Sequence, residues 1–398
     1  MSVSDAFPSA DSLRSALARW VFSPLAGVTL GDWRRVLRKR ERPVPLRYWP
    51  RVAFTGTMGL LNSAVSYRER RHEQAITDTH VEAPVFIIGH HRSGTTHLWK
   101  LLATDERFAY PSLTETLFPH TFLTFEPIAQ ALAQKFSPQE RPQDDVKVAA
   151  DAPLGEEWAL CTSTGLSPHM ARHFPEEREQ FKKYLTMRDA TAAERTRWKQ
   201  ALDRFARKLL VRYESSSTPL FKAPHHTARI PLLLDLYPNA RFVHIYRNPY
   251  RVFKSTMRME KEALPLCRYQ RGGTDTLETF VLWRYRTLYD RFFEDAGAIP
   301  DGQLTQVRFE DLVDNRVGTV ERIYDELGLN GFETTQPRLE RYVASIADYE
   351  TNSYPDLSPE KRRQIAQAWR PSFQRWNYPT PTVEKTKPNA TPSVAPLV

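Results

Sequence analysis

A short apolar run, followed at once by a glycine-framed loop and a helical pattern, constrains this chain more than any other feature. The run at residues 83–89, APVFIIG, has the length and character of a buried parallel strand. Leucines at helical spacing follow from Leu98 onward. The loop between them reads GHHRSGTT, residues 89–96. Its glycines allow a tight turn whose N–H groups converge on one anion, and a helix N-terminus adds its dipole. The segment therefore predicts a phosphate-type site.

The loop departs from the nucleotide-binding pattern G-x-x-x-x-G-K-[ST] at one position, because Thr95 stands where the lysine belongs. Enzymes that act on nucleoside triphosphates need that lysine on the outer phosphates. Arg92, inside the loop, offers instead a planar cation that can grip two anionic oxygens. The loop thus favours an anionic ligand and disfavours an ATPase or a kinase.

A second segment with anion-binding character is RFVHIYRNPYRVFKS, residues 241–255. An apolar strand pattern ends in Arg247, and Ser255 follows eight residues later. A helix that begins at Pro249 would place Ser255 nearly two turns in. Open α/β sheets bind ligands at the carboxyl ends of their strands. We therefore expect Arg247 and Ser255 to form a second phosphate site.

The order of patterns indicates the fold class. A third strand is expected at residues 303–309, QLTQVRF, followed by a helix over 317–329 that Gly328 closes. Strands that alternate with helices imply a parallel sheet covered on both faces. The prediction is a P-loop-like three-layer α/β fold with a central parallel sheet flanked by helices, plus an N-terminal helical extension.

The domain organisation follows from changes in pattern along the 398 residues. Residues 1–80 are predicted to form the helical extension, and residues 81–380 the α/β domain with a helical insertion at about 125–220. Residues 381–398 are rich in Pro, Thr and Ala and are predicted to be disordered.

Composition and charge narrow the class of partner. The net charge of +9 suits an anionic ligand, but the arginines are dispersed, so no nucleic-acid partner is expected. The only two cysteines, Cys161 and Cys267, have no metal-type spacing, which fits a reducing compartment. Neither a signal-peptide pattern nor an 18-residue apolar run occurs. We expect a cytoplasmic protein, with peripheral membrane contact through the N-terminal helices left open; the oligomeric state is not indicated.

Taken together, these residues resemble the superfamily of sulfotransferases that use 3′-phosphoadenosine 5′-phosphosulfate (PAPS), and in particular its bacterial and tyrosyl-protein branch. The stretch G-x-x-R-S-G-T-T is similar to that family's 5′-phosphosulfate loop. The R-N-P…S segment is similar to its 3′-phosphate segment, and VRFEDLV, residues 307–313, to its late strand. The resemblance covers residues 83 to about 330.

The resemblance implies a role for each matching residue. Arg247 and Ser255 would bind the 3′-phosphate, and Lys222 would stabilise charge on the phosphate leaving group. The 5′-phosphosulfate would be held by the loop residues Gly89, His91, Arg92, Ser93, Gly94, Thr95 and Thr96. PAPS would be the co-substrate, and no metal is expected to be required.

The general base that removes the acceptor's proton is left open between three choices. Glu115 lies in the segment where tyrosyl-protein relatives place a catalytic glutamate, although the register differs. His225 and His226 follow Lys222, as a histidine does in cytosolic relatives, one residue further on. Glu156 and Glu157 are the third choice. Glu115 is the first prediction and His225 the second.

The acceptor is expected to be a small or lipid-like hydroxyl compound, because aromatic side chains occur in segments expected to cover the site. These are Phe118, Phe122, Phe125 and Trp158. Two alternatives stay open, a P-loop kinase-like enzyme and a non-catalytic protein that binds PAPS or its desulfated product PAP. The first would need a lysine after Gly94, and the second should have lost Lys222.

Overall fold

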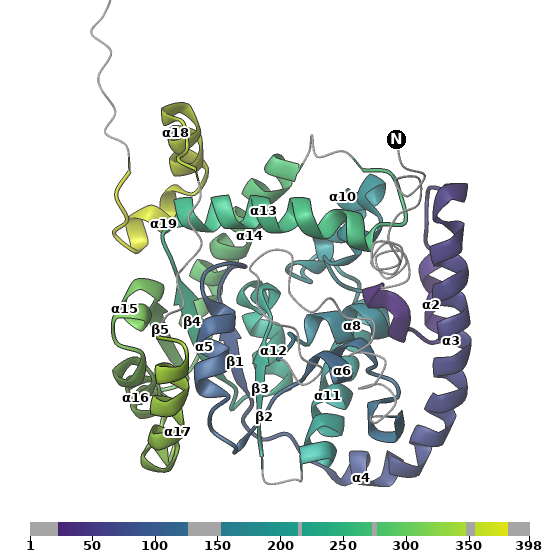
Figure 1. Ribbon diagram of the computed structural model, residues 1–398, viewed down its shortest axis with the longest axis horizontal. Helices are drawn as coiled ribbons and strands as arrows, with labels where there is room; N and C mark the ends of the chain where they lie inside the picture. Colours follow the sequence, from purple (N-terminus) through teal and green to yellow (C-terminus); the bar gives the residue numbers. More distant parts are fainter. Residues whose placement is uncertain (1–22, 126–152, 214–216, 273–276, 348–354, 381–398) are drawn as a thin grey trace, which may run out of the picture.

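A five-stranded parallel sheet forms the centre of the computed structural model, which describes residues 23–125, 153–213, 217–272, 277–347 and 355–380 (Figure 1). The strands lie in the order β2-β3-β1-β4-β5. Their bounds are β1 Val85–Ile88, β2 Phe108–Ala109, β3 Thr218–Lys222, β4 Arg241–Tyr246 and β5 Leu304–Arg308. All four neighbouring pairs are parallel, so the predicted α/β class is confirmed.

Three of these strands, β1, β4 and β5, were expected from the sequence, whereas β2 and β3 were not. Lys222 was expected just before a helix, but it is the last residue of β3. Strand β3 also begins at Thr218, within the end of the predicted helical insertion. The difference matters because β3 pairs directly with β1 and so places Lys222 next to the end of β1. In this pairing Val85 of β1 lies opposite Leu220 of β3.

One face of the sheet packs on a helical layer from two parts of the chain. Helix α5 Thr95–Leu102 follows β1, and α15 Phe309–Asp314, α16 Arg316–Leu327 and α17 Phe332–Ser345 follow β5. Val85 and Ile87 of β1 point into this core together with Leu98 and Val320. The alternating side chains of β1 divide the apolar core into two layers, as expected of a strand buried on both faces.

The opposite face is covered by a thicker helical layer. Phe86, Phe221 and Phe242 of three adjacent strands point into it. The helices nearest this face are α11 Ala192–Tyr213, α12 Ile230–Leu236 and α14 Leu277–Asp295. The further helices are α6 Leu113–Leu117, α8 Glu157–Thr164, α9 Met170–His173, α10 Arg178–Phe181, α13 Pro249–Cys267, α18 Pro359–Ala368 and α19 Arg370–Arg375.

The described part of the N-terminal region is helical, with α2 Leu30–Arg38, α3 Trp49–Glu69 and α4 Glu73–Asp78. Helix α3 stands at one edge of the molecule (Figure 1). No helix among the described residues is long and apolar enough to cross a membrane. Residues 1–22, and the tail 381–398 for which disorder is predicted, lie outside the described residues.

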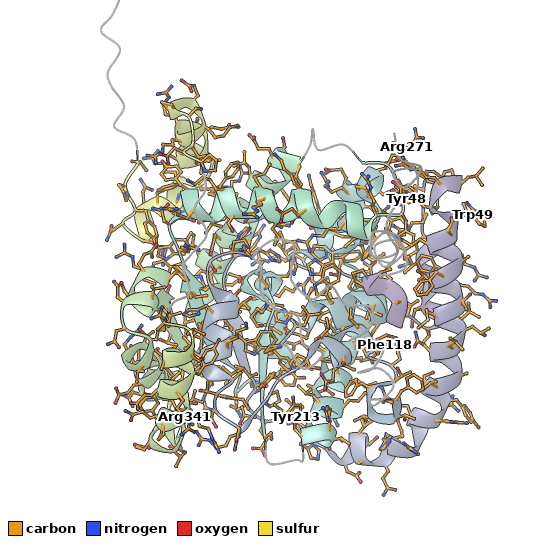
Figure 2. All side chains as sticks on the ribbon, in the orientation of Figure 1. Tyr48, Trp49, Phe118, Tyr213, Arg271 and Arg341 are labelled. Atoms are coloured by element: carbon orange, nitrogen blue, oxygen red, sulfur yellow. The ribbon has the colours of Figure 1, made fainter. Side chains whose placement is uncertain are left out.

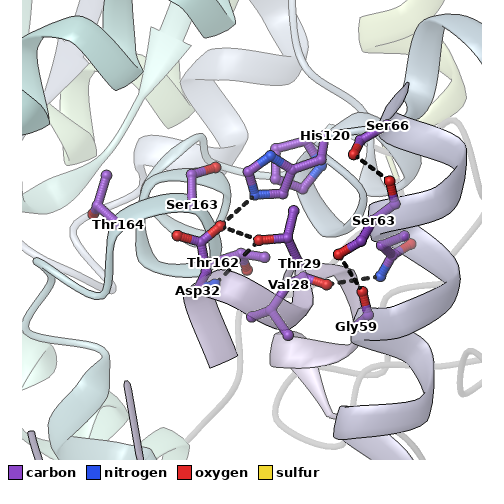
Figure 3. A network of polar contacts seen from close by, with 12 residues as sticks. Val28, Thr29, Asp32, Gly59, Ser63, Ser66, His120, Thr162, Ser163 and Thr164 are labelled. Atoms are coloured by element: carbon purple, nitrogen blue, oxygen red, sulfur yellow. Dashed lines mark hydrogen bonds and ion pairs between the residues drawn. The ribbon is translucent and has the colours of Figure 1, made fainter. Parts of the chain in front are cut away.

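Polar contacts fix this N-terminal layer to the body (Figure 3). The Thr29 side chain caps α2 by accepting a hydrogen bond from Asp32 N at 3.1 Å and donates to Asp32 Oδ2 at 2.6 Å. His120 Nε2 lies 3.4 Å from the same carboxylate oxygen. Asn62 of α3 donates to the Val28 carbonyl at 3.1 Å. The N-terminal helices are therefore an integral layer of this fold.

Candidate functional site

The carboxyl ends of three adjacent strands bring the sequence-predicted site residues to one edge of the sheet. Strand β1 ends at Ile88, directly before the loop 89–96, and its two neighbours β3 and β4 end at Lys222 and just before Arg247. Parallel strands end on the same side, so residues more than 100 positions apart in sequence become neighbours. The edge is thus where an open α/β sheet binds its ligand.

The loop 89–96 is tightly wound, and its glycines are required. Gly89 and Gly94 have φ angles of 135° and 103°, in the region that favours glycine. A Cβ at Gly89 would lie 2.2 Å from the Ile245 carbonyl oxygen, and one at Gly94 would lie 2.2 Å from the Phe309 ring. Arg92 also has a positive φ, 68°, a strained conformation that is common at ligand sites.

Hydrogen bonds from neighbouring elements hold the loop in place. Gly89 N donates to Thr227 Oγ1 at 2.7 Å, and His90 N donates to the Tyr289 hydroxyl at 3.0 Å. Ser93 Oγ donates to the His90 carbonyl at 2.8 Å. Helix α5 starts at Thr95, so its N-terminus follows directly on the loop. This rigid arrangement is what an anion cradle needs.

The two predicted phosphate-binding segments touch each other. Arg92 Nε in the loop donates to Ser255 Oγ in α13 at 2.8 Å. Asn248 caps α13 by accepting from Tyr250 N at 3.0 Å, and this fixes the helix relative to β4. The Arg247 guanidinium lies 4.0 Å from the centre of the Phe309 ring. Arg92, Arg247 and Ser255 therefore lie around one region at the sheet edge.

Lys222 lies between the loop helix and the helical layer. Its ammonium lies 5.0 Å from the centre of the Trp99 ring of α5. Its backbone N–H donates to Glu156 Oε2 at 3.0 Å. A Cβ at Gly155 would lie 2.4 Å from the Lys222 carbonyl oxygen. Glu156 and Gly155 thus pin the end of β3 beside the loop.

A cluster of histidines borders the loop on the side of Lys222. His225 Nε2 lies 3.4 Å from Nε2 of the loop residue His91. The His225 and His169 rings are 4.8 Å apart in edge-to-face contact, and Trp158 stacks on His169 at 4.0 Å. Sequence analysis proposed His91 and His225 separately, and the structure brings them together.

Burial and nearby cations keep these histidines neutral. Burial lowers the pKa of His225 and His169 well below its ordinary value, and the Arg172 guanidinium acts in the same direction. Arg172 donates to Glu260 at 2.7 and 2.9 Å, and Arg284 donates to the same carboxylate at 2.6 Å. This buried trio carries one more positive than negative charge. The sequence pattern does not reveal this trio, because its members are 88 and 24 residues apart.

Glu115 occupies a different environment from the one expected of a base. It is buried at the start of α6, where Ser112 N donates to its Oε2 at 2.7 Å in a capping box. Its Oε1 accepts from Arg212 Nε. Both carboxylate oxygens therefore already hold protein donors.

The other base candidates also have protein partners. Glu157 accepts from Arg229 NH1 at 2.7 Å and from Ser167 Oγ at 2.6 Å. Its Oε1 lies 4.0 Å from His225 Nδ1. His226 Nε2 lies 2.8 Å from Glu156 Oε1. Among the described residues, buried His225 Nδ1 has no hydrogen-bond partner, and neither do the two ring nitrogens of His226 or Glu156 Oε1.

The aromatic residues expected to cover the site divide into two kinds. Phe122 is fully buried and packs edge-to-face on Phe205 at 5.9 Å, so it belongs to the core. Trp158 lies against the histidine cluster, next to the site. Phe118 and Phe125 are half-buried in the segment before residue 126.

Comparison with known proteins gives the class. Residues 84–334 match the sulfotransferase family, a span that contains the loop, Lys222, Arg247 and Ser255. The chain belongs to this family and is an enzyme of the transferase class. This family membership excludes the two alternatives, a kinase-like enzyme and a non-catalytic binding protein.

The similarity to individual relatives extends over nearly the whole chain. The chain is 32% identical over 385 residues to the omega-hydroxy-beta-dihydromenaquinone-9 sulfotransferase Stf3 of Mycobacterium tuberculosis and of Mycobacterium bovis, and the match covers 94% of this chain and 96% of Stf3. The N-terminal helical region is therefore shared with these relatives.

Solved structures support the fold. Sulfotransferase STF9 from Mycobacterium avium superimposes with a TM-score of 0.65 at 16% identity, covering 93% of this chain and 97% of STF9. STF1 from Mycobacterium tuberculosis superimposes with a TM-score of 0.58 at 17% identity, covering 91% and 98%. Both similarities concern the arrangement of the sheet and its helices.

Proposed function

We propose that this sulfotransferase takes the sulfuryl group from PAPS and passes it to a hydroxyl group of a lipid-like acceptor. The observation that carries the proposal is the convergence of the loop 89–96, Lys222 and Arg247 at three adjacent strand ends, with Arg92 bonded to Ser255. PAPS has two phosphate-type ends, and this edge offers two groups of matching cations and hydroxyls. The residues present fit the co-substrate.

The chemistry requires an in-line displacement at sulfur. The acceptor oxygen forms a new S–O bond as the bond from sulfur to the 5′-phosphate oxygen breaks, and negative charge collects on that leaving oxygen. Lys222 and Arg92 supply fixed positive charge for it. PAP leaves with the electron pair, and the acceptor's proton passes to a base.

We propose His225 as that base, ahead of Glu115. A base needs a free lone pair near the reacting atoms. The His225 imidazole is kept neutral and touches His91 of the loop, whereas both oxygens of Glu115 accept protein hydrogen bonds. Glu157, 4.0 Å from Nδ1, would stabilise the imidazolium that forms. Glu115 would then fix the start of α6 through Arg212.

The relatives support one class of acceptor. The Stf3 proteins are named for action on a hydroxylated dihydromenaquinone, a lipid with a long apolar chain. The shared length and identity support a hydroxylated isoprenoid quinone as the acceptor of this chain. Incubating the purified enzyme with radiolabelled PAPS should label such a quinone and leave a sterol or a phenol unlabelled. Labelling of the phenol alone would contradict the lipid assignment.

Loss of Arg247 should weaken PAP binding by at least about tenfold. An arginine hydrogen-bonded to a phosphate contributes roughly 1.5–3 kcal/mol, and Arg247→Ala removes it. Isothermal titration with PAP measures the effect. Arg286→Ala, which removes an exposed arginine of α14 paired with Asp290, is the matched control and should leave affinity unchanged. Equal affinity of Arg247→Ala and wild type would contradict the assignment of the 3′-phosphate site.

The choice of base can be tested with one pair of variants. His225→Asn should lower kcat by roughly 10²–10⁴-fold, the usual contribution of a general base, while PAP affinity stays within a fewfold of wild type. Glu115→Gln should reduce thermal stability more than kcat, since it weakens the capping box. The opposite result, with kcat lost in Glu115→Gln and kept in His225→Asn, would return the role of base to Glu115.

A further inference from the structure

Helix α3 has its polar and apolar faces reversed relative to an ordinary surface helix. A helix packed on a protein core normally turns its apolar stripe inward. The side chains of α3 that are buried against the protein are instead polar or small: Arg51, Thr55, Gly59, Asn62 and Glu69.

The inward face is used by specific hydrogen bonds. Asn62 donates to the Ala26 carbonyl at 2.7 Å and to the Val28 carbonyl at 3.1 Å. The Thr55 and Tyr269 hydroxyls are 2.7 Å apart. Glu69 accepts from Leu123 N at 3.2 Å and lies 2.7 Å from the Lys208 ammonium. These contacts fix the rotation of α3, so its outward face is defined.

The outward face carries the exposed apolar side chains of the molecule. Among the described residues, the large hydrophobic side chains classed as exposed all lie between residues 46 and 67. They are Leu46 (82% exposed), Trp49 (55%), Leu60 (58%), Leu61 (54%) and Tyr67 (68%). Trp49 marks one end of this face (Figure 2), and Tyr67 lies near the other. Large apolar side chains that are exposed together along one side of the molecule mark an interaction surface.

The charges around this face are mostly positive; Glu69 faces inward beside Lys208, and Glu73, at the far end, is paired with Arg204. The stretch 43–68 contains arginines and no Asp or Glu. Exposed arginines lie at both ends, Arg47 at the start and Arg68, Arg70 and Arg71 at the finish. Tryptophan and tyrosine at the ends of an apolar stripe, together with arginines, suit the boundary between lipid headgroups and acyl chains.

We propose that the outward face of α3 docks this enzyme on the surface of a bilayer that contains anionic lipids. The 19 residues from Trp49 to Tyr67 span about 27 Å of helix axis. The polar inward face stays bonded to the protein, so α3 lies along the surface. The apolar side chains enter the outer edge of the bilayer, and the arginines contact anionic headgroups. This inference rests on the surface alone and holds for any acceptor.

Vesicle flotation of the full chain tests the proposal. Wild type should float with phosphatidylcholine vesicles that contain about one third phosphatidylglycerol, less with phosphatidylcholine alone, and less at high salt. The double variant Leu60→Glu, Leu61→Glu should bind the vesicles at least roughly tenfold more weakly than wild type, because each change removes a large apolar side chain from the lipid. Gln364→Glu, Gln367→Glu on exposed positions of α18 adds the same charge elsewhere and should bind like wild type.

A second measurement avoids added charge and any failure of the double variant to fold. The chain's two cysteines are free and buried, so a polarity-sensitive dye can be placed on Leu61→Cys. Its emission should increase and shift to the blue with anionic vesicles and not with buffer. Unchanged emission, or equal flotation of wild type and the double glutamate variant, would overturn the proposal. The proposal would also be overturned if wild type were a dimer in lipid-free buffer and the double variant a monomer, because the face would then join two copies of the chain.

Discussion

Replacing Lys222 with methionine should slow sulfuryl transfer by roughly 10²–10³-fold, the effect expected when one preorganised charge is removed from a developing anion. Lys222 ends β3 beside the loop helix, and its backbone is pinned by Glu156. Methionine keeps most of the length of the side chain, and its thioether can replace the ammonium against the Trp99 ring, so packing should survive. Single-turnover kinetics with saturating PAPS isolates the transfer step from product release.

The matched control for this variant is Lys199→Met. Lys199 lies on α11 and pairs with Asp235 on the surface, so its loss should leave the transfer rate unchanged. PAP affinity of Lys222→Met should fall much less than its rate, because the charge that Lys222 meets is greatest in the transition state. A variant that lost affinity and rate equally would place Lys222 in ground-state binding instead.

Acidification should unfold this protein steeply between about pH 6 and pH 4.5. Burial lowers the pKa of His90 and His244 to about 3 and that of His173 to about 4, and it holds those of His169 and His225 well below 6.5. Above pH 6.5 these groups are neutral in both states and contribute nothing to pH dependence. Below pH 6.5 these histidines become protonated in the unfolded chain but stay neutral in the folded chain, so the free energy of unfolding falls as pH falls.

Each such histidine costs about 1.4 kcal/mol of unfolding free energy per pH unit. Five together give roughly 7 kcal/mol per pH unit, against a total stability on the order of 5–15 kcal/mol. Denaturant unfolding at a series of pH values measures the slope. His244→Phe keeps the stacking on Phe292. The unfolded variant takes up one proton fewer, so the slope should fall by about 1.4 kcal/mol per pH unit. A flat stability profile down to pH 5 would refute the argument.

The sequence was sufficient to predict β1 and β4, which are apolar runs bounded by turn residues, and the glycine loop after β1 has a spacing that few structures allow. Strand β5, LTQVR, has only two large apolar residues, but it contains no proline and a helical pattern follows it. Strand β3, TPLFK, contains Pro219 and only two large apolar residues, so it lacks the pattern of a buried strand. A threonine–proline pair followed by Leu-Phe and then by a turn that contains Pro224 is the signal that could have revealed it.

The candidate site divides in the same way. The sequence could place Arg92 and Arg247 at this edge, because Arg92 lies in the glycine loop and Arg247 directly follows a recognisable strand pattern. Ser255 was expected on the helix that follows. Lys222 was singled out only by the resemblance, since strand β3 was not expected. The contact of His225 with His91 could not, because it depends on β3 pairing with β1. The capping box of Glu115 could have been read from Ser112 three residues earlier, but the contribution of Arg212 depends on how α11 crosses α6.

The strand order has a further consequence for the synthesis of the protein on the ribosome. Strand β1 lies between β3 and β4, which follow it by more than 100 residues. A ribosome adding about 5–20 residues per second needs roughly 10–30 seconds to make the intervening chain. Throughout that time the apolar segment Val85–Ile88 has no partner strand, and Gly89 has no Ile245 carbonyl to pack against. The ligand cradle therefore comes into existence only after more than half of the chain has been synthesised, and nascent chains interrupted before β4 should be prone to aggregate and unable to bind PAP.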